Sequence, residues 1–324
     1  MKKIRWGIAG PGNIANKFAK AVLNIDKAEL VAVASRNEER GQAFAKKYNI
    51  PIVFKSYEDM AKSNDIDAVY VATPHPFHKS CGEIFLNAKK HVLCEKPVCV
   101  NSKDAIELRE TAKKNNVFLM EAMWTRFLPL IKELQEIVKS GEIGEVRGLK
   151  ADFCYDLSAS EEHKIFDNKM AGGSLLDVGV YCLNFADMFM GKNPQITAVA
   201  DVKDGTDRHT QILLKYENGA IASISSATTL EKPADGYIYG TKGYIKLPDF
   251  YGAKELFVYS NGQEKHISKP GIGDGFEEEI IESCKCICAG KLQSDIMPAD
   301  VTLKIMEQMD YIRSQIGLKY PFDK

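Results

Sequence analysis

The chain has 324 residues, of which 45% are hydrophobic and 27% are charged. This length and apolar content are enough for a large core and favour two domains over one. The 43 basic and 44 acidic residues leave a net charge of −1, so charge gives no reason to expect nucleic acid or an anionic membrane as a partner. No stretch approaches 18 consecutive apolar residues, so the sequence predicts no membrane-spanning helix.

The first residues and the cysteines bear on the compartment. Lys2 and Lys3 look like the start of a secretory signal, but the apolar stretch that follows is short and interrupted by Arg5 and several glycines. We interpret this stretch as a first β-strand. The eight cysteines are scattered along the chain, a distribution typical of free thiols in a reducing compartment. We therefore expect a cytoplasmic protein.

Residues 1–122 alternate between two kinds of segment. Short β-branched or apolar runs predict strands at 4–9, 30–34, 68–72, 91–94 and 117–120. Helix-like segments lie between them at 13–23, 38–47, 77–88 and 102–114. Strands that alternate with helices predict a doubly wound parallel sheet, because right-handed crossovers cover both of its faces. We expect a dinucleotide-binding Rossmann domain over 1–122.

A different pattern follows over 123–324. Helices are predicted at 128–139, 173–190, 275–289 and 298–315, and strands at 146–155, 195–202, 210–216, 220–227, 236–239, 244–247 and 255–259. Asn218-Gly219 between two of these runs is a strong hairpin signal. We expect an α+β domain for substrate binding and oligomerisation, with a large, mostly antiparallel, open-faced sheet. Its C-terminal helix is able to pack back on the first domain.

Cys284, Cys286 and Cys288 are separated by single residues within a helix-like stretch. Common zinc sites use a two-residue spacer between cysteines. We therefore interpret these residues as helical cysteines and expect no metal site.

The junction of the first strand and helix has the pattern G-x-G-x-x-A, formed by Gly10, Gly12 and Ala15. The first glycine permits a tight turn, the second allows close approach of a pyrophosphate, and the small third residue lets helix and strand pack. The N–H groups at the helix start, including Asn13 and Ile14, favour an anion. The alternative is a purely structural glycine turn. We predict cofactor binding, because the turn opens a long series of strands and helices.

The end of the second strand determines the choice of cofactor. An NAD enzyme usually has a carboxylate there for the ribose 2′-hydroxyl, whereas this chain has Ser35 and Arg36. A serine hydroxyl and a guanidinium are suited to a 2′-phosphate. The sequence thus favours NADP over NAD, against the alternative of a helix cap followed by a solvated arginine.

Three further segments identify a family, Ala72–His78, Cys94–Pro97 and Gly172–Tyr181, and a fourth, Glu121–Pro129, narrows the match within it. With the glycine turn, they resemble the glucose–fructose oxidoreductase/inositol dehydrogenase (Gfo/Idh/MocA) family along essentially the whole chain. Glu95-Lys96-Pro97 is the most specific mark. The segment from Glu121 and the tyrosine at 181 resemble the branch that holds dimeric trans-1,2-dihydrobenzene-1,2-diol dehydrogenase and NADP-dependent D-xylose dehydrogenase. Inositol dehydrogenases, with histidine at the position of Tyr181, resemble the chain less.

The resemblance implies hydride transfer between a nicotinamide and a carbon that bears a hydroxyl. It implies a catalytic role for Lys96, and further cofactor contacts from strand ends and the domain junction: Thr73, Pro74, His75, His78, Glu95, Lys96, Trp124 and Arg126. Lys96 could otherwise be a surface lysine paired with Glu95. His75 and His78 could neighbour a helix cap, and Trp124 could serve domain packing.

Asp177 and Tyr181 lie four residues apart, so on an α-helix they share one face. A phenol with a pKa near ~10 is a poor base at neutral pH, and a nearby ammonium favours its charged form. Tyr181 is therefore a candidate proton shuttle assisted by Lys96, or the two roles are reversed. Asp177 would orient Lys96 or a substrate hydroxyl. Alternatively, Ser174 and Asp177 form a capping box with no catalytic role.

The predicted function is an NADP-dependent dehydrogenase or reductase for a sugar or trans-dihydrodiol-like substrate. The alternatives are an NAD-linked cyclitol dehydrogenase and an NADP-binding sensor without turnover. The open sheet face of the second domain, which the resembled family uses to dimerise, predicts a homo-oligomer, with a dimer favoured. The exact substrate depends on loops that sequence patterns do not define.

Overall fold

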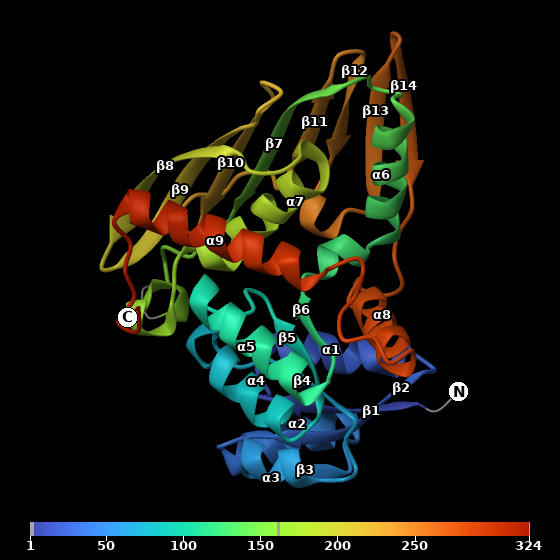
Figure 1. Ribbon diagram of the computed structural model, residues 1–324, viewed down its shortest axis with the longest axis vertical. Helices are drawn as coiled ribbons and strands as arrows, with labels where there is room; N and C mark the ends of the chain where they lie inside the picture. Colours follow the sequence, from blue (N-terminus) through green and yellow to red (C-terminus); the bar gives the residue numbers. More distant parts are fainter. Residues whose placement is uncertain (1–2, 161–162, 324) are drawn as a thin grey trace. The chain divides into compact units, whose positions relative to one another are not determined.

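The computed structural model describes residues 3–160 and 163–323, and they form two compact units (Figure 1). Unit 1 comprises Met1–Trp124 and Ile272–Lys304, and unit 2 comprises Thr125–Gly271 and Ile305–Lys324. The segment from Ile272 to Lys304, which the sequence pattern places in the second domain, thus belongs to unit 1. Within the described ranges, no helix combines the length and the apolarity needed to cross a membrane.

Unit 1 contains a six-stranded, all-parallel sheet in the order β3-β2-β1-β4-β5-β6. Its strands are β1 (Ile4–Ala9), β2 (Ala28–Ala34), β3 (Ile52–Phe54), β4 (Ala68–Val71), β5 (His91–Glu95) and β6 (Leu119–Ala122). The strands are almost continuously buried, as expected for a parallel sheet covered on both faces. The order reverses beside β1, and the carboxyl ends of β1 and β4 there form the place where such sheets bind ligands. The predicted doubly wound sheet is confirmed.

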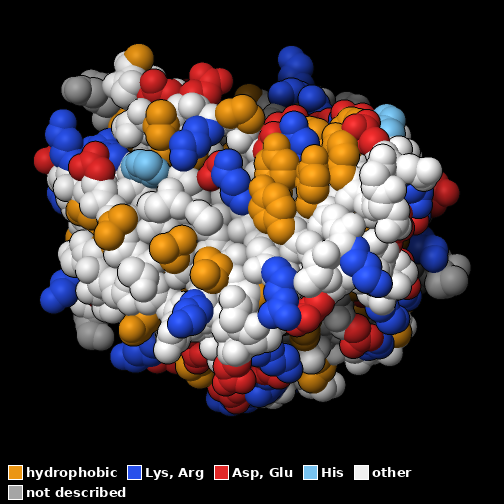
Figure 2. All heavy atoms as spheres, turned by 90° about the horizontal axis from the view of Figure 1, so that it is seen from above, with side chains coloured by type: hydrophobic (Ala, Val, Ile, Leu, Met, Phe, Trp, Pro, Cys, Tyr) orange, Lys and Arg blue, Asp and Glu red, His pale blue; other side chains and the backbone are white. Residues whose placement is uncertain are grey.

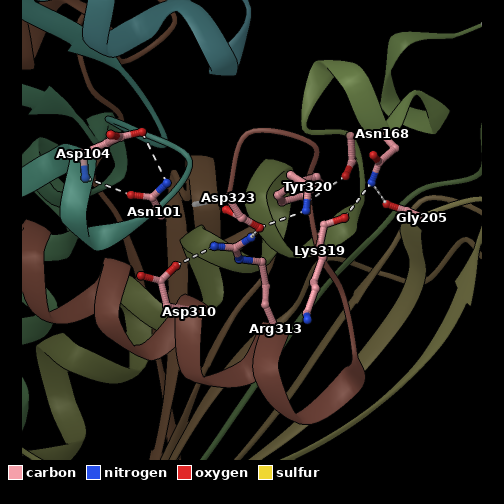
Figure 3. A network of polar contacts seen from close by, with 10 residues as sticks. Asn101, Asp104, Asn168, Gly205, Asp310, Arg313, Lys319, Tyr320 and Asp323 are labelled. Atoms are coloured by element: carbon pink, nitrogen blue, oxygen red, sulfur yellow. Dashed lines mark hydrogen bonds and ion pairs between the residues drawn. The ribbon is translucent and has the colours of Figure 1, made fainter.

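The helices of unit 1 connect these strands in sequence. They are α1 (Asn13–Leu23), α2 (Glu38–Tyr48), α3 (Tyr57–Lys62), α4 (His78–Asn87), α5 (Ser102–Asn115) and α8 (Glu277–Cys288). Several begin at a side-chain cap: Asn37 caps α2, Ser56 caps α3, and Asn101 caps α5 by accepting from the Asp104 N–H at 2.8 Å (Figure 3). Helix α8 carries the closely spaced cysteines, with Cys284 and Cys286 buried and Cys288 exposed. All eight cysteines are free thiols.

Unit 2 contains an eight-stranded mixed sheet in the order β14-β13-β12-β11-β7-β10-β9-β8. Its strands are β7 (Val146–Cys154), β8 (Gln195–Lys203), β9 (Thr206–Lys215), β10 (Ile221–Ala227), β11 (Gly236–Gly240), β12 (Gly243–Leu247), β13 (Glu255–Ser260) and β14 (Gln263–Ser268). All neighbours are antiparallel except β7 and β10. The Asn218-Gly219 turn joins β9 and β10, and Gly219 takes the positive φ of 82° that this turn requires.

The helices of unit 2 are α6 (Pro129–Ser140) and α7 (Val180–Met190), and the final helix α9 (Ala299–Ile316) crosses the division between the units. Helix α7 packs on β7 and β10, so one face of the sheet is covered. A single helix was expected over 173–190. The structure instead has a π-helical turn at Leu175–Gly179 that leads into α7. This change of helical period alters where Asp177 points relative to Tyr181.

The C-terminal residues of unit 2 are held by a polar network (Figure 3). Arg313 binds Asp310 at 2.8 Å and Asp323 at 2.6 Å, with its guanidinium buried. The hydroxyl of Tyr320 donates to the carbonyl of Gly172 at 2.9 Å. The network therefore fixes the backbone just before the turn that begins at Gly173.

Candidate active site

The glycine turn of unit 1 leaves room for a ligand at the start of α1. Gly10 has a φ of 93°, and a Cβ there would lie 3.2 Å from the Ala72 carbonyl oxygen. Gly12 is the N-cap of α1 and offers no side chain, so the N–H groups of Asn13 and Ile14 have no side-chain cap. The side-chain amide of Asn16 donates to the Gly12 carbonyl at 2.9 Å and thereby stabilises the turn. A helix start of this kind favours an anion.

Thr73 supplies an independent test of fit at this turn. Its side chain is 8% exposed, and its hydroxyl oxygen has no hydrogen-bond partner in the described structure. The Thr73 methyl group would lie 3.4 Å from a Cβ at Gly10, so the residue borders the glycine turn. A buried hydroxyl without a partner costs free energy unless a ligand or water binds it. The residues around Gly10 thus suit a dinucleotide phosphate group.

Ser35 and Arg36 follow β2, as predicted, and Arg36 borders a small cavity. Ser35 is buried, and its hydroxyl accepts from the Asn37 N–H at 3.2 Å. The Arg36 guanidinium carbon lies 5.6 Å from the centroid of the Phe77 ring. Arg36, Phe77 and Thr73 line a cavity of about 200 Å³ together with residues of α3 and α4. The guanidinium therefore already contacts the ring, and its charge beside this cavity suits a ligand phosphate.

Lys96 lies in a turn that several backbone and side-chain contacts fix. It follows β5 directly, and its N–H donates to the Glu95 carboxylate at 3.2 Å. Glu95 is buried and also accepts from the Tyr70 hydroxyl. One residue beyond the cis peptide bond Lys96–Pro97, the Val98 N–H donates to Glu121 at 3.0 Å. The Lys96 side chain is thus carried by a turn held from both β5 and β6.

The residues after β4 differ in their exposure. Pro74 and His75 are half-buried at the end of the sheet. His78 is 0% exposed, and its two ring nitrogens lie 2.7 Å from the Thr73 carbonyl oxygen and 2.8 Å from that of Pro97. Both nitrogens of His78 are therefore engaged by the protein itself, and we do not retain it among the cofactor contacts.

Trp124 and Arg126 also have partners within their own units. Trp124 is buried and stacks on Phe276 at 5.0 Å between ring centroids. Arg126 is buried in unit 2, where it binds Asp187 at 2.5 Å and donates to Asn184 at 2.7 Å. These contacts tie the chain before α6 to α7. The Arg126 guanidinium is thus engaged by residues of unit 2 itself.

In unit 2, the turn before the π-helical segment is closed by a carboxylate. Asp207 is fully buried, and one of its oxygens accepts from the Ser174 hydroxyl at 2.6 Å, the Leu175 N–H at 2.8 Å and the Thr210 hydroxyl at 2.8 Å. Gly173 has a φ of 121°, and a Cβ there would lie 2.1 Å from the other oxygen. Burial raises the pKa of Asp207, and these hydrogen bonds oppose the rise.

This arrangement replaces the capping box considered for Ser174 and Asp177. Ser174 forms no side-chain cap, because its hydroxyl donates to Asp207. Asp177 instead accepts from the Tyr155 hydroxyl at 2.5 Å. Burial, and then the Asp177 carboxylate, raises the pKa of Tyr155, so this phenol stays protonated and able to donate. The capping interpretation of Asp177 is wrong, because the cap comes from a residue 33 positions away in the sequence.

Tyr181 lies at the start of α7 within an aromatic cluster. Its side chain is 7% exposed, and its ring centroid lies 5.4 Å from Phe153 and 6.2 Å from Tyr251. Phe153 and Tyr251 stack on each other at 4.1 Å. The cluster fixes the Tyr181 ring and surrounds it with apolar surface.

Sequence reasoning missed Phe153, Tyr155, Asp207 and Tyr251. Phe153 lies near the end of β7 and Tyr155 directly follows the strand, two residues further on. Side chains two residues apart on an extended chain point to the same face, so this spacing could have predicted that both face the site. Tyr251 lies in a short 3-10 turn, and Asp207 lies in a strand, with no local pattern that marks either one.

Comparison with known proteins agrees with this geometry. The model for "Oxidoreductase family, NAD-binding Rossmann fold" (GFO_IDH_MocA) matches residues 4–123, and that for the "GFO/IDH/MocA C-terminal domain" matches residues 131–246. Trans-1,2-dihydrobenzene-1,2-diol dehydrogenase of Mus musculus is 36% identical over 99% of both chains. The protein of the same name from Homo sapiens is 32% identical, again over 99% of both.

Two solved structures share the fold. A 3-ketoreductase from Actinomadura kijaniata has a TM-score of 0.90 at 23% identity and covers 97% of this chain and 98% of its own. An aldose-aldose oxidoreductase from Caulobacter crescentus has a TM-score of 0.89 at 24% identity and covers 97% of each chain. With family matches over both units and relatives above 30% identity along the full length, this chain belongs to the Gfo/Idh/MocA family of oxidoreductases.

Proposed function

We propose that this oxidoreductase transfers a hydride between NADP(H) and a hydroxyl-bearing carbon of a sugar or a trans-dihydrodiol. The observation that carries the proposal is the start of α1, where uncapped N–H groups and a glycine turn border the unpartnered Thr73 hydroxyl. Gly10, Gly12, Asn13 and Ile14 bind the pyrophosphate, and Thr73, Pro74, His75, Glu95 and Lys96 border the rest of the cofactor. Trp124, whose ring stacks on Phe276, is the last of these proposed cofactor contacts.

Ser35 and Arg36 support NADP over NAD. Among the solved structures that share the fold, the 3-ketoreductase is in complex with NADP and a levoglucosan dehydrogenase is in complex with NADH, so the fold accommodates both cofactors. The choice then depends on the end of β2, where the chain has the hydroxyl of Ser35 and, lining the cavity, the guanidinium of Arg36. Neither group repels a 2′-phosphate as a carboxylate would.

The nicotinamide, when bound, supplies the hydride acceptor or donor. The chain must then move a proton on the substrate hydroxyl. Tyr181 exchanges this proton, and the Lys96 ammonium stabilises negative charge that develops on the oxygens involved. Asp177, held by Tyr155, orients a substrate hydroxyl or the Lys96 ammonium. The aromatic cluster of Phe153 and Tyr251 limits water around the phenol.

A panel assay tests this function. Purified protein is incubated with NADP⁺ or NAD⁺ and a set of aldoses, trans-diols and cyclitols, and cofactor reduction is followed by absorbance. We expect turnover with NADP⁺ on an aldose or a trans-diol, in line with the names of the relatives. Turnover confined to NAD⁺ and cyclitols would replace the proposal with an NAD-linked cyclitol dehydrogenase. Tight NADP(H) binding without any turnover would indicate a sensor.

A homodimer is the proposed assembly, and a second copy is proposed to cover the open face of the unit 2 sheet. Ile221, Tyr239 and Tyr244 are 50%, 40% and 38% exposed and lie in one row across neighbouring strands. Figure 2 shows hydrophobic side chains gathered in a compact group, bordered by charged ones, on the face that it draws. Exposed apolar patches of this kind mark association surfaces. Light scattering at micromolar concentration should report twice the mass of the chain, and Tyr239→Glu should shift it to the monomer.

A further inference from the structure

His78 is a fully buried histidine at the first position of α4, and its ring is fixed from both sides. Its Nδ1 lies 2.8 Å from the Pro97 carbonyl oxygen, and its Nε2 lies 2.7 Å from the Thr73 carbonyl oxygen. A backbone carbonyl can only accept a hydrogen bond. Each ring nitrogen that carries a proton therefore donates to the carbonyl oxygen that it faces.

The two carbonyls belong to the two loops that make up the unit 1 part of the proposed site. Thr73 borders the glycine turn, since Ala72 and Thr73 are the residues nearest to a Cβ at Gly10. Pro97 directly follows Lys96. One rigid ring thus joins the wall of the phosphate-binding turn to the turn that carries the catalytic lysine.

We propose that His78 is a positioning residue that fixes Lys96 relative to the glycine turn through the contacts of its two ring nitrogens. This inference rests on the proposed function, in which Lys96 acts on the substrate. His78 itself touches neither cofactor nor substrate, because it is 0% exposed and both ring nitrogens are engaged. The nearest aromatic neighbour, His75, approaches it edge-on at 5.7 Å between ring centroids.

Few side chains can replace this bridge. Both N–H donors of a glutamine amide lie on one nitrogen, whereas the imidazole presents two separated nitrogens, so we expect glutamine to hold one loop and release the other. Leucine fills similar space without any donor and leaves two buried carbonyls without this partner. The second brace of the turn, from Glu121 to the Val98 N–H, remains in either variant. The effect of His78 is therefore expected to be local and compatible with folding.

Hydrogen exchange of the full-length protein tests the bridge without reference to activity. His78→Gln and His78→Leu should accelerate amide exchange in peptides that cover 94–99 and 72–77, with the rest of unit 1 unchanged. His91→Gln is the matched control, because His91 is half-buried at the start of β5 and accepts from the Phe118 N–H at 3.0 Å. Wild-type exchange over 94–99 in both His78 variants would overturn the proposal.

Nitrogen-15 NMR gives a second structural readout. The His78 ring signal, assigned by its loss in His78→Gln, should show an N–H proton that is protected from exchange with solvent. Ring protons that exchange freely with solvent would overturn the bridge.

A kinetic cycle then separates positioning from general stability. His78→Gln should lower kcat by roughly tenfold or more, since a small displacement of a catalytic group is costly. Added to Lys96→Met, His78→Gln should cause little further loss, because the two residues act as one unit. Losses that multiply in the double variant would indicate a merely structural role. If Lys96→Met keeps full turnover, the proposed function fails, while the exchange measurement still decides the role of His78.

Discussion

Each unit has a glycine of positive φ in the turn before a helical segment, Gly10 before α1 and Gly173 before the π-helical turn, but the two turns differ in what occupies the start of the segment. At α1 in unit 1, Gly12 offers no side chain and the N–H groups face an open turn. At the π-helical turn in unit 2, the Asp207 carboxylate accepts from Leu175 and closes the turn. One helix start is left for a ligand anion, and the other is filled by the protein's own carboxylate.

The difference shows how one local geometry serves two purposes. An open helix start is a binding site whose occupant arrives from solution. A closed one fixes the direction of the helix that follows, and here that helix carries Asp177 and Tyr181. The glycine is required in both cases, because a Cβ at Gly10 would crowd the Ala72 carbonyl and one at Gly173 would strike Asp207. Four changes test the comparison.

The largest expected effect is on turnover, and it concerns Tyr181, which follows the closed turn of unit 2. Tyr181→Phe removes one hydroxyl and keeps the packing against Phe153, so turnover should fall by about 10²–10⁴-fold, the range for general acid–base catalysis. NADPH affinity should barely change, because Tyr181 belongs to unit 2. Steady-state kinetics and fluorescence titration measure the two quantities. Tyr216→Phe, a buried tyrosine outside the aromatic cluster, is the control. Wild-type turnover in Tyr181→Phe would place the proton shuttle elsewhere.

Opening the closed turn should cost stability. Asp207→Ala leaves Ser174, Leu175 and Thr210 without their common acceptor, and we expect a loss of roughly 2–4 kcal/mol in the free energy of unfolding. Urea denaturation followed by circular dichroism measures it. Asp204→Asn is the control, since Asp204 is 72% exposed and asparagine accepts its positive φ of 53°. Equal stability of the two variants would mean that the carboxylate does not hold the turn.

The open turn is tested through its ligand. Arg36→Ala removes a charge-assisted contact to the 2′-phosphate, worth about 1.5–3 kcal/mol, so NADP(H) binding should weaken by roughly ten- to a hundredfold. NAD(H) binding should stay nearly unchanged. Arg40→Ala, an exposed arginine on the neighbouring α2, should leave both affinities as they are. Equal weakening of both cofactors by Arg36→Ala would remove the basis for NADP preference.

The smallest expected effect concerns pH. The pKa of Asp207 is raised by burial, so the folded state holds this proton at pH values where the unfolded chain, with an aspartate pKa of about 3.9, releases it. The stability associated with this proton is fully present below that value and is lost as pH rises through the raised pKa. Asp207→Asn should therefore flatten the pH dependence of unfolding above pH ~4, as measured by urea titration at several pH values. An unchanged pH dependence would contradict the raised pKa.

The sequence predicts those elements whose pattern lies within a short stretch of the chain. In unit 1, β1 and α1 occur at the predicted residues, because a strand, a glycine turn and an amphipathic helix are each encoded locally. The strand β3, with 3 residues, and the helix α3, with 6, are too short to show periodicity.

The two parts of the candidate site differ in the same way. Gly10, Arg36 and Lys96 lie in contiguous motifs that follow strands. Asp177 and Ser174 have partners that lie far from them in the sequence and belong to no common motif. Tyr155 is 22 residues from Asp177, and Asp207 is 33 residues from Ser174. The inward direction of His78 is likewise a tertiary property, because both of its acceptors are backbone carbonyls that no side-chain pattern identifies.

The division of unit 1 into two separate chain segments has a consequence for biosynthesis. Helix α8, which packs on α1, is translated only after the whole of the first unit 2 segment. Lys17 forms an ion pair with Asp274 at 2.7 Å, and Asn24 donates to Glu277 at 2.9 Å. Both contacts can form only after residues 274–277 have been translated. The nascent parallel sheet therefore emerges from the ribosome with one side of α1 uncovered, and the eight-stranded sheet is complete in sequence before that cover arrives. Unit 1 is complete only once Lys304 has been translated, and the last segment of unit 2 follows it.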